Sequence, residues 1–169
     1  LIGRLLGESV DLYPERGMSR YAQLLDVINH YRPRRICEIG TWSGSNALRM
    51  IQAAAKYQTM ERILYQGFDL FAQQTGEHFR RELSKHGWPR EIVQRRLDAT
   101  GAQIDLVEGD TNQTLFPALQ LDDKSEPAEF YFVDGGHSEE TIRHDAFVVL
   151  EAMWYPANVV AVFDDYYHA

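Results

Sequence analysis

The sequence predicts an α/β domain in which a parallel sheet of about five strands carries helices on both faces. Three observations lead to this fold class. The chain has 169 residues, enough for one domain with a sizeable core. Short apolar runs alternate with longer segments of helical spacing, which is the pattern of a doubly wound sheet. The expected strands also end in similar ways, with acidic residues at or close to their carboxyl ends.

The apolar runs give the expected strands at residues 35–39, 63–68, 104–108, 130–133 and 159–163. Helical spacing gives helices from Ser19 up to Pro33, over 45–57, on each side of Gly87-Trp88-Pro89 within 70–100, from about 111, and over 138–153. In the last helix we expect Ile142, Phe147, Leu150 and Met153 to face inward. Together these elements form a single domain, residues 1–169, with a helical extension over 1–34 and a core over 35–169.

Acidic residues follow four of the five strands. Asp69, Asp110, Asp134 and the pair Asp164-Asp165 come at or just after strand ends. The carboxyl ends of parallel strands meet at one edge, where open α/β sheets bind their ligands. We therefore expect these side chains to converge on one crevice. The alternative is that each aspartate only favours a turn or caps a helix.

The segment from Glu38 to Gly44 joins the first strand to the next helix through a glycine turn. Glycine lets the backbone approach a ligand closely, and the free N–H groups that begin a helix can hold a carboxylate. Glu38 can attract a ligand ammonium. A dinucleotide fingerprint needs glycine where this chain has Trp42, so the turn favours a nucleoside bearing an amino acid. The Asp69 carboxylate can then accept hydrogen bonds from the ribose hydroxyls, and Asp110 can reach an adenine amino group.

Composition narrows the classes of partner. The net charge of −8 argues against a nucleic-acid backbone, and no apolar run approaches the ~20 residues that span a bilayer. The single cysteine, Cys37, excludes an intrachain disulfide and lies in an apolar run, where a buried thiol is expected. We expect a cytoplasmic protein that binds neither nucleic acid nor membrane.

The ordered series Glu38, Gly40, Gly44, Asp69 and Asp110 resembles the class I S-adenosylmethionine-dependent methyltransferases, from about residue 34 to the end of the chain. The resemblance implies a Rossmann-like fold that binds S-adenosylmethionine. By this resemblance, the glycine turn with Ser43 holds the methionine part, Asp69 the ribose, and Asp110 lies near the adenine.

Two later segments, 132–138 and 162–166, look like the metal-dependent small-molecule O-methyltransferases, the macrocin type most closely and the catechol type more distantly. In that family, carboxylates after the fourth and fifth strands bind Mg²⁺; the matching residues are Asp134, Asp164 and Asp165. Strand ends ~4.8 Å apart can share one hard cation, which relieves repulsion between carboxylates. The alternative is that Asp134 and Asp164 cap helices while Asp165 is solvated.

The resemblance implies methyl transfer to a hydroxyl of a small-molecule acceptor, such as a sugar or a phenol. His137 or Asp134 would take the hydroxyl proton, although His137 can equally cap the helix that follows. Two rival functions are a cofactor-binding domain without turnover and another Mg²⁺-dependent enzyme on the same frame. Relatives in this family often pair, which implies a homodimer. Their sheets also have two further strands after the fifth, so either the whole protein is longer or this domain is shortened.

Overall fold

The computed structural model describes residues 3–5, 8–10, 20–82, 85–119, 127–154 and 158–164. Within this part of the chain, a parallel sheet of five strands has the order β5-β4-β3-β6-β7. Chain order therefore runs outward from β3 to β5 and then returns to the other side of β3. The switch point lies between β3 and β6, which is where open α/β sheets form their ligand crevice.

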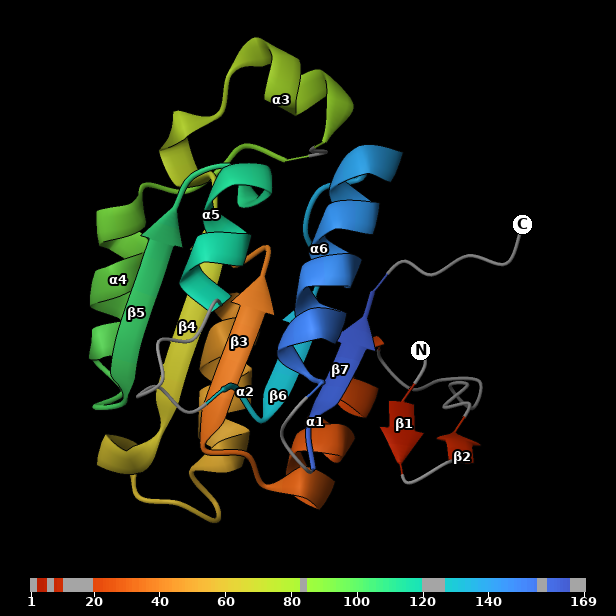
Figure 1. Cartoon of the computed structure of the whole chain (residues 1–169). Coiled ribbons are helices and arrows are strands. Elements are labelled where there is room, and N and C mark those ends of the chain that lie inside the picture. Colours follow the sequence, from red (N-terminus) through yellow and green to blue (C-terminus); the bar gives the residue numbers. More distant parts are fainter. Residues whose placement is uncertain are drawn as a thin grey trace.

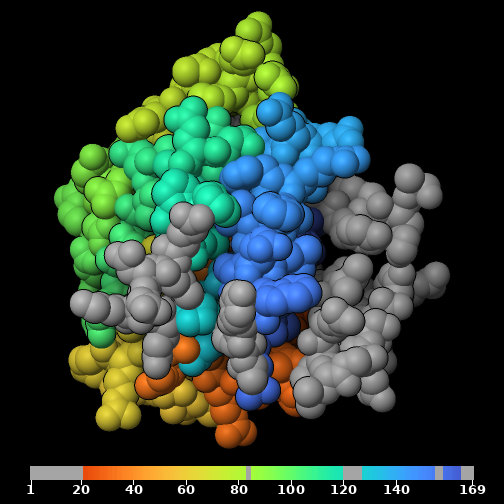
Figure 2. All heavy atoms as spheres, in the orientation of Figure 1, coloured from red at the N-terminus to blue at the C-terminus, as the bar shows by residue number. Residues whose placement is uncertain are grey.

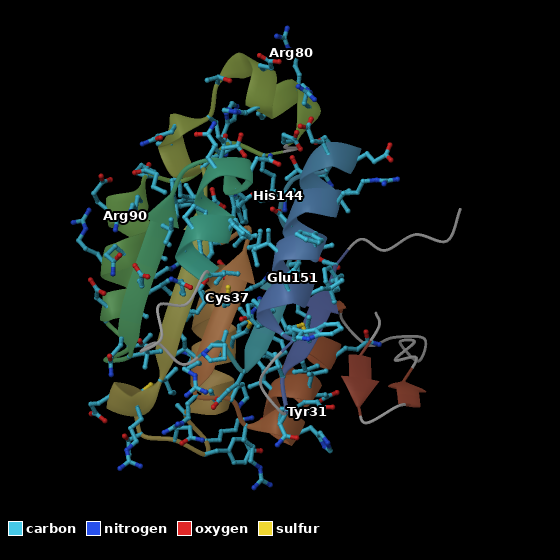
Figure 3. All side chains as sticks on the ribbon, in the orientation of Figure 1. Tyr31, Cys37, Arg80, Arg90, His144 and Glu151 are labelled. Atoms are coloured by element: carbon cyan, nitrogen blue, oxygen red, sulfur yellow. The ribbon has the colours of Figure 1, made fainter. Side chains whose placement is uncertain are left out.

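Each of the five expected strands is present. Their bounds are Arg35–Ile39 (β3), Leu64–Asp69 (β4), Gln103–Glu108 (β5), Phe130–Val133 (β6) and Val160–Phe163 (β7). The strands β3, β6 and β7 are almost continuously buried, as expected when helices cover both faces of a sheet. Cys37 is fully buried in β3, as predicted (Figure 3).

Helices cover both faces of this sheet. Arg20–Tyr31 (α1), Ser45–Ala54 (α2) and Arg90–Asp98 (α4) pack against one face, through one apolar cluster. Thr111–Leu119 (α5) and Glu139–Ala152 (α6) pack against the other, which faces the viewer in Figure 1. The short helices Met60–Arg62 (η1), Phe71–Gln73 (η2) and Gly76–Arg81 (α3) lie in connections. In Figure 1, α3 lies beyond the carboxyl ends of the strands.

The inward face expected for residues 138–153 is wrong. Ile142, Phe147 and Leu150 are 52%, 59% and 56% exposed, and only Met153 is partly buried against the core. The buried face of α6 instead carries Thr141, Asp145, Val148 and Val149. Polar Thr141 and Asp145 can occupy it because they hydrogen-bond to Asn112 and Thr111 at the start of the next helix of this layer, so Ile142, Phe147 and Leu150 do not mark the buried face.

Residues before the core also differ from the expected helical extension. Besides α1, they include a short antiparallel pair, Gly3–Leu5 (β1) with Glu8–Val10 (β2). Strands of three residues are too short for a periodic pattern to show. The expected start of the first helix at Ser19 and the final carboxylate, Asp165, lie outside the described residues. No helix in the described ranges is long and apolar enough to cross a membrane.

Candidate functional site

A cavity of about 720 Å³ opens at the carboxyl edge of the sheet. Its floor comes from the turns after β3, β4, β5 and β6, and α2 and α3 contribute further walls. The lining includes most of the predicted site residues: Gly40, Ser43, Asp69, Asp110, Asp134 and His137. The structure therefore brings the residues after four different strands to one place, as the pattern of strand ends predicts.

The glycine turn after β3 touches the turn after β6. Gly40 has a left-handed φ of 91°, and a Cβ on it would lie 1.9 Å from the Asp134 carbonyl oxygen. Only glycine fits this conformation and this approach. Ser43 is buried at the cavity wall, and its carbonyl oxygen accepts a 2.9 Å hydrogen bond from Arg96 of α4. Gly44, by contrast, faces α4 and is not part of the cavity lining.

Asp69 binds the backbone of two loops at once. Its Oδ2 accepts a hydrogen bond from the Trp42 amide at 2.7 Å, and its Oδ1 accepts one from the Phe71 amide at 2.6 Å. Both donors have φ near 47°, a strained conformation for bulky residues. Burial raises the pKa of Asp69, and the two amide bonds partly offset this rise. The carboxylate therefore fixes the glycine turn and retains lone pairs for hydroxyl donors in the cavity.

Asp110 lies between β5 and α5 and lines the cavity. Its Oδ1 accepts hydrogen bonds from the Asn112 backbone amide at 2.9 Å and from the Asn112 side chain at 3.0 Å. The same amide group donates to Thr141 Oγ1 of α6 at 3.1 Å. Asp110 thus has the turn-forming role considered as the alternative, while it also lines the cavity.

Glu38 is fully buried beneath the cavity and is not part of its lining. Its Oε2 accepts a short hydrogen bond from the Tyr65 hydroxyl, which lies 3.3 Å from Thr41 Oγ1. Oε1 has no protein partner in the described structure. Burial raises the pKa of Glu38 well above its usual range, and the negative charges of Asp134 and Asp69 raise it further. An unsatisfied carboxyl oxygen is therefore present directly below the glycine turn.

The turn after β6 carries Asp134 and leads into α6. Asp134 follows Val133, which pairs with Phe163, so the next residues, Asp134 and Asp164, end neighbouring strands. Asp134 lines the cavity. Asp164, at the matching position after the next strand, is half-buried and does not line the cavity. Among the residues that the structure describes, no three carboxylates, histidines or cysteines form a metal cluster. The third expected ligand, Asp165, lies outside those residues.

His137 is an exposed residue at the start of α6 and lines the cavity. The helix is capped by Ser138, whose side chain accepts a hydrogen bond from the Thr141 amide. The capping role considered for His137 therefore belongs to Ser138. This leaves the imidazole at the cavity wall, where a ligand can meet it.

Sequence reasoning missed two groups of residues at this site. The first is a segment after β4, residues 70–82 and 85–89, which we call the roof; several of its side chains line the cavity: Leu70, Gln74, Glu77, His78, Arg81, Glu82 and Lys85. The second is Asp145 of α6, which does not line the cavity but is buried behind the lining residue Gly135, and its Oδ1 lies 3.1 Å from His144 Nδ1. Burial raises the pKa of Asp145. The predicted orientation of α6 placed Asp145 away from the core, so the sequence pattern gave no signal for it.

The order of the strands and the position of the cavity define a class I methyltransferase-like α/β domain. A family described as "Methyltransferase domain" matches residues 37–166, most of the chain, and the protein belongs to this family. The resemblance to S-adenosylmethionine-dependent methyltransferases is therefore confirmed at the level of family and fold. No curated protein sequence matches the chain.

Several solved structures share the fold. The O-methyltransferase TomG from Streptomyces achromogenes, involved in tomaymycin synthesis and solved with SAM, is 18% identical with a TM-score of 0.61; the match covers 89% of this chain and 57% of TomG. The SAH-bound methyltransferase PaMTH1 from Podospora anserina is 20% identical, with a TM-score of 0.57, and the match covers 87% and 53%. A Mg–SAM complex of cmcI is 19% identical, with a TM-score of 0.50, over 96% and 61%. The chain thus spans little more than half the length of the first two.

Proposed function

We propose that this chain is the cofactor-binding domain of an S-adenosylmethionine-dependent methyltransferase that acts on a hydroxyl of a small molecule, with help from Mg²⁺. One observation carries the proposal: the glycine turn, Asp69, Asp110 and Asp134 surround one cavity at the switch point of the sheet. Membership of the methyltransferase family supports the reaction class. TomG, described as an O-methyltransferase, supports oxygen as the acceptor atom.

The charges around the turn suit a ligand that is positive at this point. Glu38, Asp69 and Asp134 lie close enough for their charges to interact, and Glu38 Oε1 has no protein partner in the described structure. A buried carboxyl oxygen without a partner is costly, and an ammonium or a water bound to one can satisfy it. S-adenosylmethionine carries both an ammonium and a sulfonium. The residues therefore fit this nucleoside, and Asp69 and Asp110 provide acceptors along the rest of the cavity.

Asp134 and Asp164 fit a hard divalent cation. Carboxylate oxygens are the ligands that Mg²⁺ prefers, and the two residues end adjacent strands. The cmcI complex with Mg and SAM supports the same pairing of metal and nucleoside on this fold. Asp134, Asp164 and Asp165 would hold the ion, whose chemistry is to lower the pKa of an acceptor hydroxyl.

The residues of the chain then have distinct tasks. Bound S-adenosylmethionine supplies the electrophilic methyl group and leaves as S-adenosylhomocysteine. The turn from Gly40 to Ser43 and Asp69 fix the nucleoside, so that the acceptor oxygen meets the methyl group in line; such positioning supplies much of the rate acceleration. His137 and Asp134 are the two candidate bases at the cavity wall, and either can accept the hydroxyl proton.

Calorimetry with S-adenosylhomocysteine, with and without Mg²⁺, tests the proposal. We expect binding by the wild type, and we expect Asp164→Ala to weaken Mg²⁺ binding at least tenfold. The matched control, Asp105→Ala, removes an exposed carboxylate from β5 and leaves both affinities unchanged.

Turnover is measured separately, as release of S-adenosylhomocysteine with a panel of phenols and sugars, with and without a chelator. Binding without turnover on any acceptor would favour a non-catalytic binding domain. Absence of S-adenosylhomocysteine binding would refute the proposal. Unchanged Mg²⁺ affinity in Asp164→Ala would contradict the proposed metal site but not the proposed binding of S-adenosylmethionine.

A further inference from the structure

The roof is attached to the sheet edge on one side by several contacts. Phe71 donates to Asp69, and the Gly87 amide donates to Gln74 Oε1 at 2.8 Å. The Trp42 indole donates to the His86 carbonyl oxygen at 2.9 Å, and the Lys85 ammonium lies 4.6 Å from the centre of the same ring. The first contact ties the start of the roof to the end of β4, the second closes the roof on itself, and the two Trp42 contacts tie its last residues to the glycine turn. The roof is therefore held firmly on the side that faces the glycine turn.

The other side of the roof reaches α6 across the cavity. Glu82 Oε2 accepts a 2.9 Å hydrogen bond from the Ser138 amide, at the N-terminus of α6. In the described part of the chain, the second contact on this side is the exposed pair Arg81–Glu140, at 4.0 Å. An exposed pair at this distance contributes little. Glu82 is therefore the main connection between the roof and α6.

The chemistry of this contact favours a charged carboxylate. A helix N-terminus has free N–H groups and a partial positive charge, which attract an anion. Burial opposes the charge of Glu82, but hydrogen bonds from Ser138 and Thr141 outweigh it and lower its pKa. The chain also leaves room for the carboxylate, because a Cβ on Gly136 would lie 2.7 Å from Glu82 Oε2.

We propose that Glu82 is a positioning residue that latches the roof to α6 over the cavity, so that release of this contact sets the rate at which the bound nucleoside leaves. The inference rests on the proposed function, since it takes the ligand to be S-adenosylmethionine or its product. Glu77, His78 and Arg81 of α3 line the cavity together with the turns below it. A ligand in the cavity is therefore enclosed between roof and sheet edge, and it leaves when the roof lifts from α6. Figure 2 shows the yellow-green atoms of this segment above α5 and α6.

The test compares Glu82→Ala and Glu82→Gln with the control Arg80→Ala. Arg80 lies in α3, two residues before Glu82, does not line the cavity, and points away from the body of the protein in Figure 3. Stopped-flow chase experiments measure the dissociation rate of S-adenosylhomocysteine. We expect about a tenfold increase in Glu82→Ala, a smaller one in Glu82→Gln, and none in Arg80→Ala.

Hydrogen exchange of residues 76–82 in the ligand-free protein gives a second measurement. We expect faster exchange in Glu82→Ala while the core strands stay protected, because only a local contact is lost. Gly136→Ala displaces the Glu82 carboxylate and should give the same phenotype. In the double variant Glu82→Ala/Gly136→Ala the two effects should not add.

Unchanged roof exchange in Glu82→Ala overturns the latch, whether or not a ligand binds. Equal dissociation rates in Glu82→Ala and wild type also overturn it. A wild type that fails to bind S-adenosylhomocysteine, but whose roof exchange depends on Glu82, instead refutes the proposed function and keeps the latch.

Discussion

Glu38 and Asp69 are carboxylates on neighbouring strands, the first fully buried and the second half-buried, and the fold satisfies them differently. Each Asp69 oxygen accepts a backbone amide bond, from Trp42 and Phe71. Glu38 has one oxygen on Tyr65 and one without a protein partner in the described structure. Burial raises the pKa of both. The difference separates a carboxylate whose two oxygens hold the fold's own backbone from one that leaves an oxygen without a protein partner, which is the oxygen that the proposed ligand ammonium would use.

The largest effect is expected for Asp69→Asn. An amide nitrogen would face a backbone N–H that the carboxylate now accepts, and the strained Trp42 or Phe71 conformation would lose its partner. We expect a loss of about 2–3 kcal/mol in the free energy of unfolding, together with loss of S-adenosylhomocysteine binding. Urea denaturation and calorimetry measure the two effects. Asp105→Asn, on the exposed edge strand, is the control. Equal stability of Asp69→Asn and wild type would contradict the role of Asp69 in holding the Trp42 and Phe71 backbone.

Tyr65→Phe tests the only hydrogen bond that the described structure gives to Glu38. Without the hydroxyl, both carboxyl oxygens lack a partner, and the hydroxyl of Thr41 loses its neighbour. We expect a loss of about 1–2 kcal/mol in the free energy of unfolding, measured in urea at pH 7. A loss as large as that of Asp69→Asn would mean that the two carboxylates matter equally for the ligand-free fold.

Glu38→Gln should change stability in the opposite direction. The folded pKa of Glu38 is raised, so its protonated form stabilises the fold at low pH, and this contribution falls as pH rises above about 4.5. A neutral glutamine keeps the hydrogen bond from Tyr65, and its contribution to stability does not decrease as pH rises. We expect the variant to be more stable than wild type by about 1 kcal/mol at pH 8, with equal stability near pH 4.

The same variant should bind S-adenosylhomocysteine about tenfold more weakly, because the counter-charge for the ammonium is lost. A gain in the free energy of unfolding together with weaker binding of S-adenosylhomocysteine would show that the Glu38 carboxylate serves the ligand. A loss of stability that accompanies the weaker binding would mean that Glu38 serves the fold alone.

The smallest effect is expected at Cys37, which precedes Glu38 and is fully buried. Burial raises the pKa of the thiol, and the neighbouring Glu38 adds to the rise. We expect no alkylation by iodoacetamide in the native protein over hours, and rapid alkylation in urea. Fast native labelling would mean that β3 opens readily, and the burial argument for Glu38 would then weaken as well.

The sequence predicts the sheet well for a physical reason. Strands buried on both faces appear as continuous apolar runs, and parallel strands place their carboxyl ends at one edge, so the sequence already predicts that Asp69 and Asp134 lie at the same edge. Helix α6 was predicted in position but not in orientation. Ile142, Phe147 and Leu150 are exposed, while Thr141 and Asp145 are buried because they hydrogen-bond to Asn112 and Thr111 at the start of α5. Periodicity cannot anticipate such polar contacts between helices.

The roof could not be predicted because its contacts depend on long-range pairs. Glu82 meets Ser138 across 56 residues of sequence, and Trp42 meets His86 across 44. Nothing in the local pattern of residues 70–89 indicates either partner. The individual roles of Glu38 and Gly44 were equally out of reach, since strand and turn geometry decide that both lie outside the cavity lining.

The contact between Gly40 and the Asp134 carbonyl has a consequence for how this protein can diverge. A single methyl group at position 40 would overlap the backbone of the neighbouring turn, so position 40 must stay glycine whichever side chain stands at position 134. Change is instead free to accumulate at roof positions whose exposed side chains do not hold the roof in place, such as Arg80. Descendants of this sequence are therefore expected to keep the same floor while they exchange the covering segment, and with it the molecules they admit.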